Sequence, residues 1–153
     1  MLSGSRLAID RALENFLAAA HNELTTIDSQ LTSIGGALSE FLTGGKRLRP
    51  LFAIAGFLGA GGSPDDESIY KAAVSLELLQ ACALIHDDMM DGSDTRRGAP
   101  SMHRRFERNH RERHGVGDSE SFGHATALLI GDLALVWSTQ ALNLSGLSLT
   151  QLQ

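Results

Sequence analysis

The feature that most constrains the fold is the long segment from Pro64 to Asp91, which contains no residue that would break a helix after its first turn. A stretch of about 28 such residues predicts a helix roughly 42 Å long. Ser63 is placed to cap this helix, Pro64 suits its first turn, and Gly92 suits its end. Its middle, residues 72–85, is almost uniformly apolar. A helix of that kind must be covered by neighbours, so the segment predicts a helical core.

The rest of the chain favours the same class of fold. Apolar residues recur at helical spacing, which predicts further helices over residues 7–25 (capped by Ser5), 27–41, 50–61 and 122–144. The third of these is apolar nearly all round and is expected to be central in the fold. We predict an all-α protein, with a solvated loop over the Arg- and His-rich stretch His103–His114 and the first turn of another helix at Ser148–Gln153.

Composition excludes several classes of protein. The chain is 42% hydrophobic and 20% charged, which is ordinary for a globular protein and not for a disordered one. A single cysteine, Cys82, excludes a disulfide framework and a cysteine-based zinc site. It fits a cytoplasmic location. No uninterrupted apolar run reaches the length that spans a bilayer, so we expect no stable membrane insertion.

Three carboxylates are expected together at the end of the long helix. Asp87 and Asp91 are one turn apart and share a face, and Asp88 lies at its edge. Their placement is unfavourable by itself, because a helix C-terminus prefers cations and the three charges repel one another. Mg²⁺, which takes carboxylate oxygens together with water and phosphate, would reverse that penalty. The alternative is an ordinary solvated acidic helix end.

Two basic segments could bind phosphate. In GGKRLRP, Lys46 and Arg49 follow a glycine turn and precede a helix start, which itself favours anions. Arg96 and Arg97 lie on a loop shortly after Asp91, where a short connection can fold back over the carboxylates. Taken singly, either segment could also be solvated surface charge.

Taken together, these segments are far more specific. The order and spacing of GGKRLRP, LELLQACALIHDDMMD, TRRG and GHATALLIGDLAL resemble the N-terminal half of the trans-polyprenyl diphosphate synthases, also called short-chain isoprenyl diphosphate synthases. The resemblance covers Gly44 to about Trp137. It implies an isoprenoid synthase-type helical bundle around a central cavity, usually in a homodimer. It also implies a Mg²⁺-dependent prenyltransferase that condenses isopentenyl diphosphate with an allylic diphosphate. The expected product is geranylgeranyl or farnesyl diphosphate.

The resemblance also assigns roles to residues. Asp87, Asp88 and Asp91 match the first aspartate-rich motif, which holds Mg²⁺ on the allylic diphosphate, and Arg96 matches a ligand of the same diphosphate; these four are the catalytic set. Isopentenyl diphosphate would be bound by Lys46, Arg49, Gln80 and Arg97, with Arg47 left open as a further ligand. His86 is expected to pack or to support a neighbouring site residue and not to bind metal, and Cys82 to be a small wall residue. Asp132 is expected to close a hydrogen bond or to support the dimer. Because Cys82 and Ala83 are small, a product of C20 or longer is favoured over C15.

One departure from the family pattern limits the resemblance. The family carries a second aspartate-rich motif in its C-terminal half, and this sequence has none. Residues 1–153 are therefore expected to be the N-terminal part of a single polyprenyl synthase domain. Two other interpretations stay open. One is a non-catalytic or regulatory half that keeps the diphosphate loops. The other is a nucleic-acid-binding module using Arg96–Arg113, which lacks an aromatic platform beyond Phe106.

Overall fold

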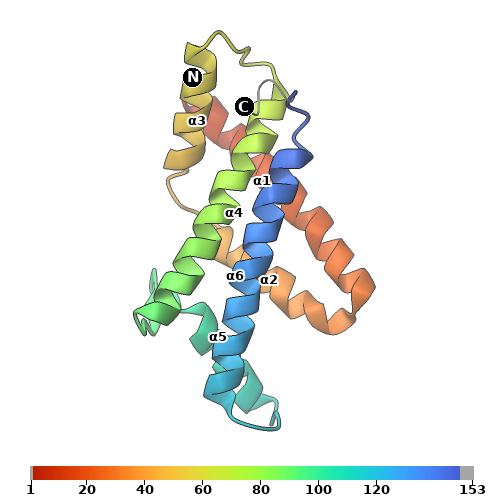
Figure 1. Ribbon diagram of the computed structural model, residues 1–153, viewed down its shortest axis with the longest axis vertical. Helices are drawn as coiled ribbons and strands as arrows, with labels where there is room; N and C mark the ends of the chain where they lie inside the picture. Colours follow the sequence, from red (N-terminus) through yellow and green to blue (C-terminus); the bar gives the residue numbers. More distant parts are fainter. Residues whose placement is uncertain (1, 149–153) are drawn as a thin grey trace. The chain divides into compact units, whose positions relative to one another are not determined.

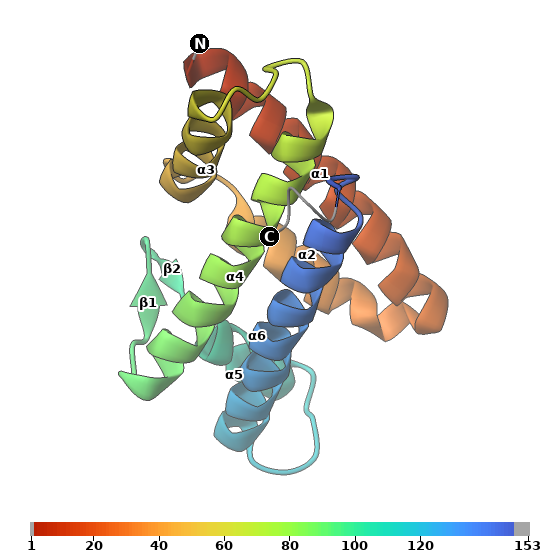
Figure 2. The same cartoon turned by 45° about the horizontal axis from the view of Figure 1, so that its top comes forward.

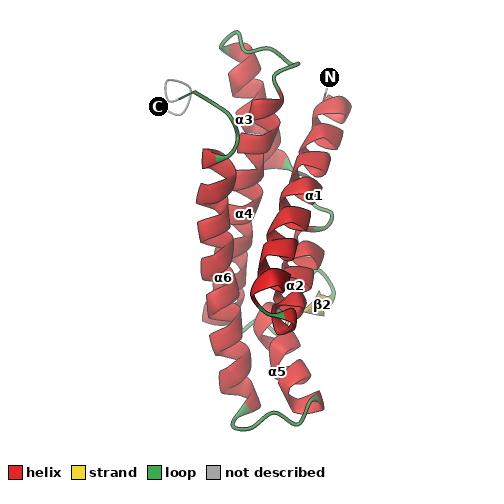
Figure 3. Cartoon of the chain, turned by 90° about the vertical axis from the view of Figure 1, so that its right-hand side faces the viewer, coloured by secondary structure: helices red, strands yellow, loops and turns green. Residues whose placement is uncertain are grey.

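The computed structural model describes residues 2–148, and most of these are helical (Figures 1 and 3). The expected all-α class is confirmed. The predicted helical turn at Ser148–Gln153 falls almost wholly outside the described residues. In chain order the elements are α1 (Leu2–Ile27), η1 (Ser29–Leu31), α2 (Thr32–Leu42), α3 (Leu48–Gly59), α4 (Glu67–Met90), β1 (Thr95–Arg96), β2 (Ala99–Pro100), α5 (Met102–Glu112) and α6 (Ser119–Asn143).

The described chain divides into two compact units. The first comprises residues 2–79 and 136–148, and the second comprises residues 80–135, so α4 and α6 contribute to both. In the first unit, Ile9 of α1, Ile54 of α3 and Ala73 of α4 belong to one buried cluster. Ser138 of α6 donates a hydrogen bond to the carbonyl of Ser75 (2.9 Å). This buried hydrogen bond links α6 to α4 within the first unit.

The second unit is built around the C-terminal part of α4, α5 and the first part of α6. Ile85, Phe106 and Ile130 are buried in it. Gly123 of α6 lies against the backbone of α5: a β-carbon there would meet the carbonyl oxygen of His103 and stand 2.8 Å from the backbone nitrogen of Glu107. The absence of a side chain at Gly123 therefore allows the two helices to approach each other.

Three predicted helix starts are wrong. The helix expected from residue 27 begins at Thr32, because α1 continues to Ile27 and η1 follows it. α1 begins at Leu2, so Ser5 lies inside the helix, where it is buried, and does not cap it. α4 begins at Glu67 and its cap is Asp66, whose carboxylate accepts the backbone N–H of Ser68 (3.0 Å). Hydrogen bonding to Ser68 also lowers the pKa of Asp66. Ser63 instead accepts the N–H of Asp65 (3.2 Å) within the preceding turn.

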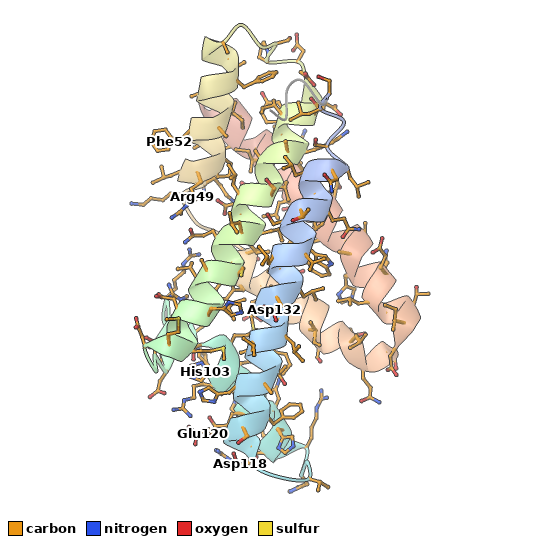
Figure 4. All side chains as sticks on the ribbon, in the orientation of Figure 1. Arg49, Phe52, His103, Asp118, Glu120 and Asp132 are labelled. Carbon is orange, nitrogen blue, oxygen red and sulfur yellow. The ribbon has the colours of Figure 1, made fainter. Side chains whose placement is uncertain are left out.

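The stretch expected to be a solvated loop contains a helix, α5. Met102, His103, Phe106 and His110 are buried and recur at helical spacing, with the arginines outside them. Figure 4 labels His103, which belongs to the buried face of α5. Sequence periodicity missed this helix because half of its buried face is histidine, a residue normally counted as polar.

The expectation for α3 is also wrong. Although it is apolar nearly all round, Phe52 and Leu48 are 75% and 54% exposed, and only Pro50 and Ile54 are buried among its residues. Figure 4 shows Phe52 at the outer side of the helix. In the described chain α3 therefore presents an apolar face to solvent instead of filling the centre of the fold.

A short β-hairpin with two residues in each strand follows α4, although the sequence had not predicted a strand there. Thr95 pairs with Pro100 and Arg96 pairs with Ala99 in an antiparallel register. Its turn consists of Arg97 and Gly98, with φ angles of 54° and 79°. Positive φ at both central residues is the turn geometry that matches the twist of short hairpins. Figure 2 shows the hairpin beside the C-terminal end of α4.

Although neither contains an uninterrupted apolar run, α4 and α6 are both long and apolar enough on average to cross a membrane. Half of the most apolar 18-residue stretch of α4 and a third of the corresponding stretch of α6 are buried inside the protein. The core helices of water-soluble proteins meet the same criterion, so this observation is weak evidence for a membrane span.

Candidate active site

The three aspartates stand at the end of α4 in different environments. Asp87 is well exposed, at 57% of its side chain, whereas the side chain of Asp88 is only 2% exposed. Asp91 lies just beyond the helix and is exposed, and its backbone N–H still bonds to the carbonyl of Asp87 (2.9 Å). The helical spacing thus continues to Asp91. Asp87 and Asp91 offer carboxylate oxygens to solvent one turn apart, while Asp88 faces inward.

The buried aspartate is held by the first hairpin strand. Arg96 donates from Nε and Nη2 to the two carboxylate oxygens of Asp88, at 2.7 Å each. Its Nη2 also lies 3.4 Å from Asp87. Hydrogen bonds to Asp88 raise the pKa of the Arg96 guanidinium above its usual value. A planar guanidinium thus bridges two of the aspartates, in the bidentate geometry that also suits phosphate.

The hairpin is fixed to α5 by a second arginine. Arg104 donates from Nε to Asp94 and from Nη1 to Glu107, at 2.7 Å each. The N–H of Ser101 bonds to the carbonyl of Asp94 (2.9 Å). Hydrogen bonds to Glu107 and Asp94 raise the pKa of Arg104. These contacts hold both ends of the hairpin, and Arg97 is left exposed at its tip.

The donor set suits Mg²⁺ in part. Among residues 2–148 no group of three histidine, cysteine or acidic side chains is already close enough to hold a metal ion. Asp87 and Asp91 are nevertheless exposed oxygen donors, and Mg²⁺ commonly takes one or two carboxylates and completes its shell with water and phosphate. Both oxygens of Asp88 are engaged by Arg96. The assignment of all three aspartates as metal ligands stays a prediction.

The basic loop lies in the first unit. Its backbone has positive φ at Gly44 and Gly45, and the side chains of Lys46 and Arg49 are exposed on either side of Arg47 (Arg49 is labelled in Figure 4). Arg49 stands in the first turn of α3. These positions agree with a pair of cations available to an anion near a helix N-terminus.

Arg47 does not fit the role of a further ligand. Its side chain is 6% exposed and donates to Asp10 (2.9 Å), Glu77 (2.6 Å) and the carbonyl of Leu42 (2.8 Å). Burial disfavours its charged form, but the hydrogen bonds to Asp10 and Glu77 outweigh that effect and raise its pKa. The sequence motif gave no sign of this difference between Arg47 and its neighbours.

The remaining candidate residues have simple environments. Gln80 is partly buried on α4, two turns before Asp87. His86 lies 3.2 Å from the carbonyl of Leu128 and 3.8 Å from both Asp132 and Cys82. Burial raises the pKa of the Cys82 thiol, which disfavours a nucleophilic thiolate. The expected packing role of this group is consistent with these contacts.

The model of the polyprenyl synthetase family matches residues 32–152. The chain belongs to the polyprenyl synthetase family. The resemblance read from GGKRLRP, the aspartate cluster and TRRG is thereby confirmed.

The similar proteins include synthases of two product lengths. The chain is 37% identical over 103 residues to a geranylgeranyl diphosphate synthase of Saccharolobus solfataricus, covering 67% of this chain and 26% of that protein. It is 35% identical over 124 residues to a farnesyl diphosphate synthase of Bacillus subtilis, covering 80% of this chain and 35% of that protein. The chain thus spans about a quarter to a third of the length of these relatives.

A solved structure matches nearly the whole chain. The crystal structure of geranylgeranyl pyrophosphate synthase from Corynebacterium glutamicum, complexed with isoprenyl diphosphate and magnesium, superposes with a TM-score of 0.89 at 46% identity. The match covers 97% of the present chain and 43% of the Corynebacterium glutamicum synthase. The isoprenoid synthase helical fold is therefore shared over the described residues.

Proposed function

We propose that the chain is part of a Mg²⁺-dependent prenyltransferase that condenses isopentenyl diphosphate with an allylic diphosphate to give a longer polyprenyl diphosphate. The observation that carries this proposal is the cluster at the end of α4. There, Asp87 and Asp91 are exposed one turn apart, and Arg96 lies 3.4 Å from Asp87 while it binds the carboxylate of Asp88 with bidentate geometry. Family membership and the relatives' names support the same reaction.

The proposed chemistry follows from these groups. Ionisation of an allylic diphosphate leaves negative charge on the departing pyrophosphate, and preorganised donors stabilise that charge. Arg96 would supply such donors from β1. Asp87 and Asp91 would hold Mg²⁺, with Asp88 as the third proposed ligand, and the bound ion would neutralise diphosphate charge.

The second substrate needs its own binding residues. Lys46 and Arg49 are exposed cations beside a helix start, and we assign them to isopentenyl diphosphate together with Gln80 and Arg97. The allylic cation also needs an apolar wall that keeps water away from it. Ala83 is exposed on α4 one turn before Asp87, and its small side chain leaves room for a long product. On that basis we favour geranylgeranyl over farnesyl diphosphate.

The proposal extends to partners and location. We propose a cytoplasmic homodimer without stable membrane insertion, and with no role for nucleic acid. The arginines of α5 support the last point, since Arg104 and Arg111 are paired with Asp94 and Glu107 and do not form an open basic stripe. Within the described residues no observation favours a non-catalytic partner half.

The test measures elongation of labelled isopentenyl diphosphate by a full-length synthase that carries these residues. Asp87→Asn should lower Mg²⁺-dependent turnover by about two orders of magnitude or more, because it removes an exposed ligand beside the arginine. Asp65→Asn serves as the matched control, since Asp65 is an exposed acid beyond the other end of α4. Near-normal turnover of the Asp87 variant would contradict the assignment.

A further inference from the structure

Arg47 lies between the two exposed cations of the basic loop, but its own side chain is directed into the protein. All three nitrogens of its guanidinium donate: Nε to Asp10 at 2.9 Å, Nη1 to Glu77 at 2.6 Å and Nη2 to the carbonyl of Leu42 at 2.8 Å. With 6% of its side chain exposed, little of Arg47 is available to a substrate. Its function must be sought in what these contacts hold.

The three partners come from three different helices of the first unit. Asp10 is on α1, Leu42 is the last residue of α2 and Glu77 is on α4. The two acidic partners are also partly buried: the side chain of Asp10 is 33% exposed and that of Glu77 is 13% exposed. One guanidinium therefore fastens the start of α3 to three helices, with charge-assisted bonds on two sides.

The backbone at Arg47 needs such an anchor. Its φ angle is 52° and its ψ angle is 32°, the left-handed conformation that is unfavourable for a residue with a β-carbon. Such conformations persist where the surroundings determine them, and they concentrate at functional sites. The two residues before Lys46 are glycines with positive φ, Gly44 and Gly45, which would leave an unanchored loop many alternatives.

We propose that Arg47 is a positioning residue: its ion pairs with Asp10 and Glu77 set the loop conformation in which Lys46 and Arg49 bind one diphosphate together. This inference rests on the proposed function, because it assigns the diphosphate to that pair. Lys46 directly precedes Arg47 in the chain, and Arg49 follows in the first turn of α3. If the backbone at Arg47 left its left-handed conformation, the distance between the charges of Lys46 and Arg49 would therefore change.

The first test is kinetic and uses the full-length synthase that carries these residues. Arg47→Gly keeps the left-handed backbone accessible but removes the anchor. We expect it to raise KM for isopentenyl diphosphate by about tenfold while kcat changes by less than about threefold, because a misplaced pair of cations weakens binding before it affects chemistry. KM for the allylic substrate should stay within about twofold.

A second variant separates positioning from folding. Arg47→Met combined with Asp10→Asn and Glu77→Gln leaves no stranded carboxylate, so it should melt at a higher temperature than Arg47→Met alone. Its KM for isopentenyl diphosphate should still be about tenfold higher. Arg11→Met is the matched control, since it removes an exposed arginine from α1, and it should leave KM unchanged. An unchanged KM in both Arg47 variants overturns the inference.

A third readout does not depend on activity. In the 153-residue chain, trypsin should cleave after Lys46 about tenfold faster in Arg47→Gly than in the wild type, because the released loop can enter the protease. If the wild-type synthase shows no prenyl transfer, the proposed function is wrong, and the trypsin rates alone then decide whether Arg47 fixes the loop. Equal cleavage rates would overturn the positioning role.

Discussion

Removing Arg96 should expose how much of the candidate site depends on one buried ion pair. Arg96→Met takes away both hydrogen bonds that hold the carboxylate of Asp88, each 2.7 Å long. The side chain of Asp88 is 2% exposed, so its charge would remain in the interior without a partner. The partial contact of Arg96 with Asp87 is longer, at 3.4 Å, and its loss should matter less.

The magnitude follows from burial. Removing one partner of a fully buried pair typically costs about 3–5 kcal/mol, because the remaining charge is uncompensated. Arg96 itself is 25% exposed, so water can enter the space it leaves. We therefore expect Arg96→Met to lower the free energy of unfolding by about 2–3 kcal/mol. Asp88→Asn should lower it by about 1 kcal/mol, since the amide oxygen still accepts a hydrogen bond.

The double variant provides the decisive measurement. If the stranded carboxylate dominates the loss in Arg96→Met, adding Asp88→Asn should recover part of it, and the double variant should be about 2 kcal/mol more stable than the sum of the single losses predicts. Urea unfolding followed by circular dichroism measures all three. Arg108→Met, on the exposed side of α5, is the control and should cost less than about 0.5 kcal/mol. Additive losses would refute the reasoning.

Three further predictions follow from the same residues. Ala83→Phe should shorten the main product of a full-length synthase, because Ala83 is exposed one turn before Asp87, whereas Cys82→Phe should mainly destabilise the protein, because Cys82 is buried against His86. Product chain length and melting temperature distinguish the two, and a shorter product from Cys82→Phe alone would contradict the assignment. The pKa of His103 is lowered, chiefly by burial and then by His124 and Arg104, with Asp88 and Asp94 acting in the opposite direction. Its contribution to stability should be complete above the unfolded-state pKa of about 6.5 and be lost as the pH falls from there through the lowered folded-state pKa. The free energy of unfolding between about pH 7.5 and 5.5 should therefore change less with pH in His103→Phe than in the wild type. Equal slopes of the free energy of unfolding against pH in the two proteins would refute this. Finally, Leu128, Leu129 and Leu135 of α6 are 48%, 66% and 45% exposed, so the 153-residue chain should self-associate through this helix. Light scattering from a stable monomer would contradict that expectation. Because the sequence has no second aspartate-rich motif, the 153 residues alone should show no prenyl transfer, and clear chain elongation by them would contradict this.

Much of the helical fold could be predicted because burial follows the sequence period. The apolar spacing that defined the helices at 7–25, 27–41 and 122–144 corresponds to α1, α2 and α6, with starts that differ by three to five residues and ends that differ by one or two. α5 was missed because His103 and His110 occupy buried positions that periodicity assigns to apolar residues. Phe52 was misplaced for the opposite reason, since an apolar side chain does not reveal whether a neighbour covers it.

The candidate site could be located from its motif but not resolved from it. The spacing predicts a common face for Asp87 and Asp91 and places Asp88 at its edge, but it does not show that Asp88 is buried. That difference arises when the Arg97–Gly98 turn brings Arg96 back toward α4. In GGKRLRP three cations look equivalent. Arg47 is distinguished only by partners that lie 37 residues before it and 30 residues after it, Asp10 and Glu77.

The hairpin turn has a consequence for attempts to make this protein more robust. Its central residues, Arg97 and Gly98, both have positive φ, the conformation for which Asn-Gly is the preferred pair. Arg97→Asn is therefore the substitution that a stabilisation campaign would choose first, and turn chemistry says that the hairpin would gain from it. It would also delete a guanidinium proposed to contact isopentenyl diphosphate. Selection for heat tolerance alone would then erode catalysis at this turn, whereas selection for turnover would keep an arginine in a backbone conformation that suits asparagine better.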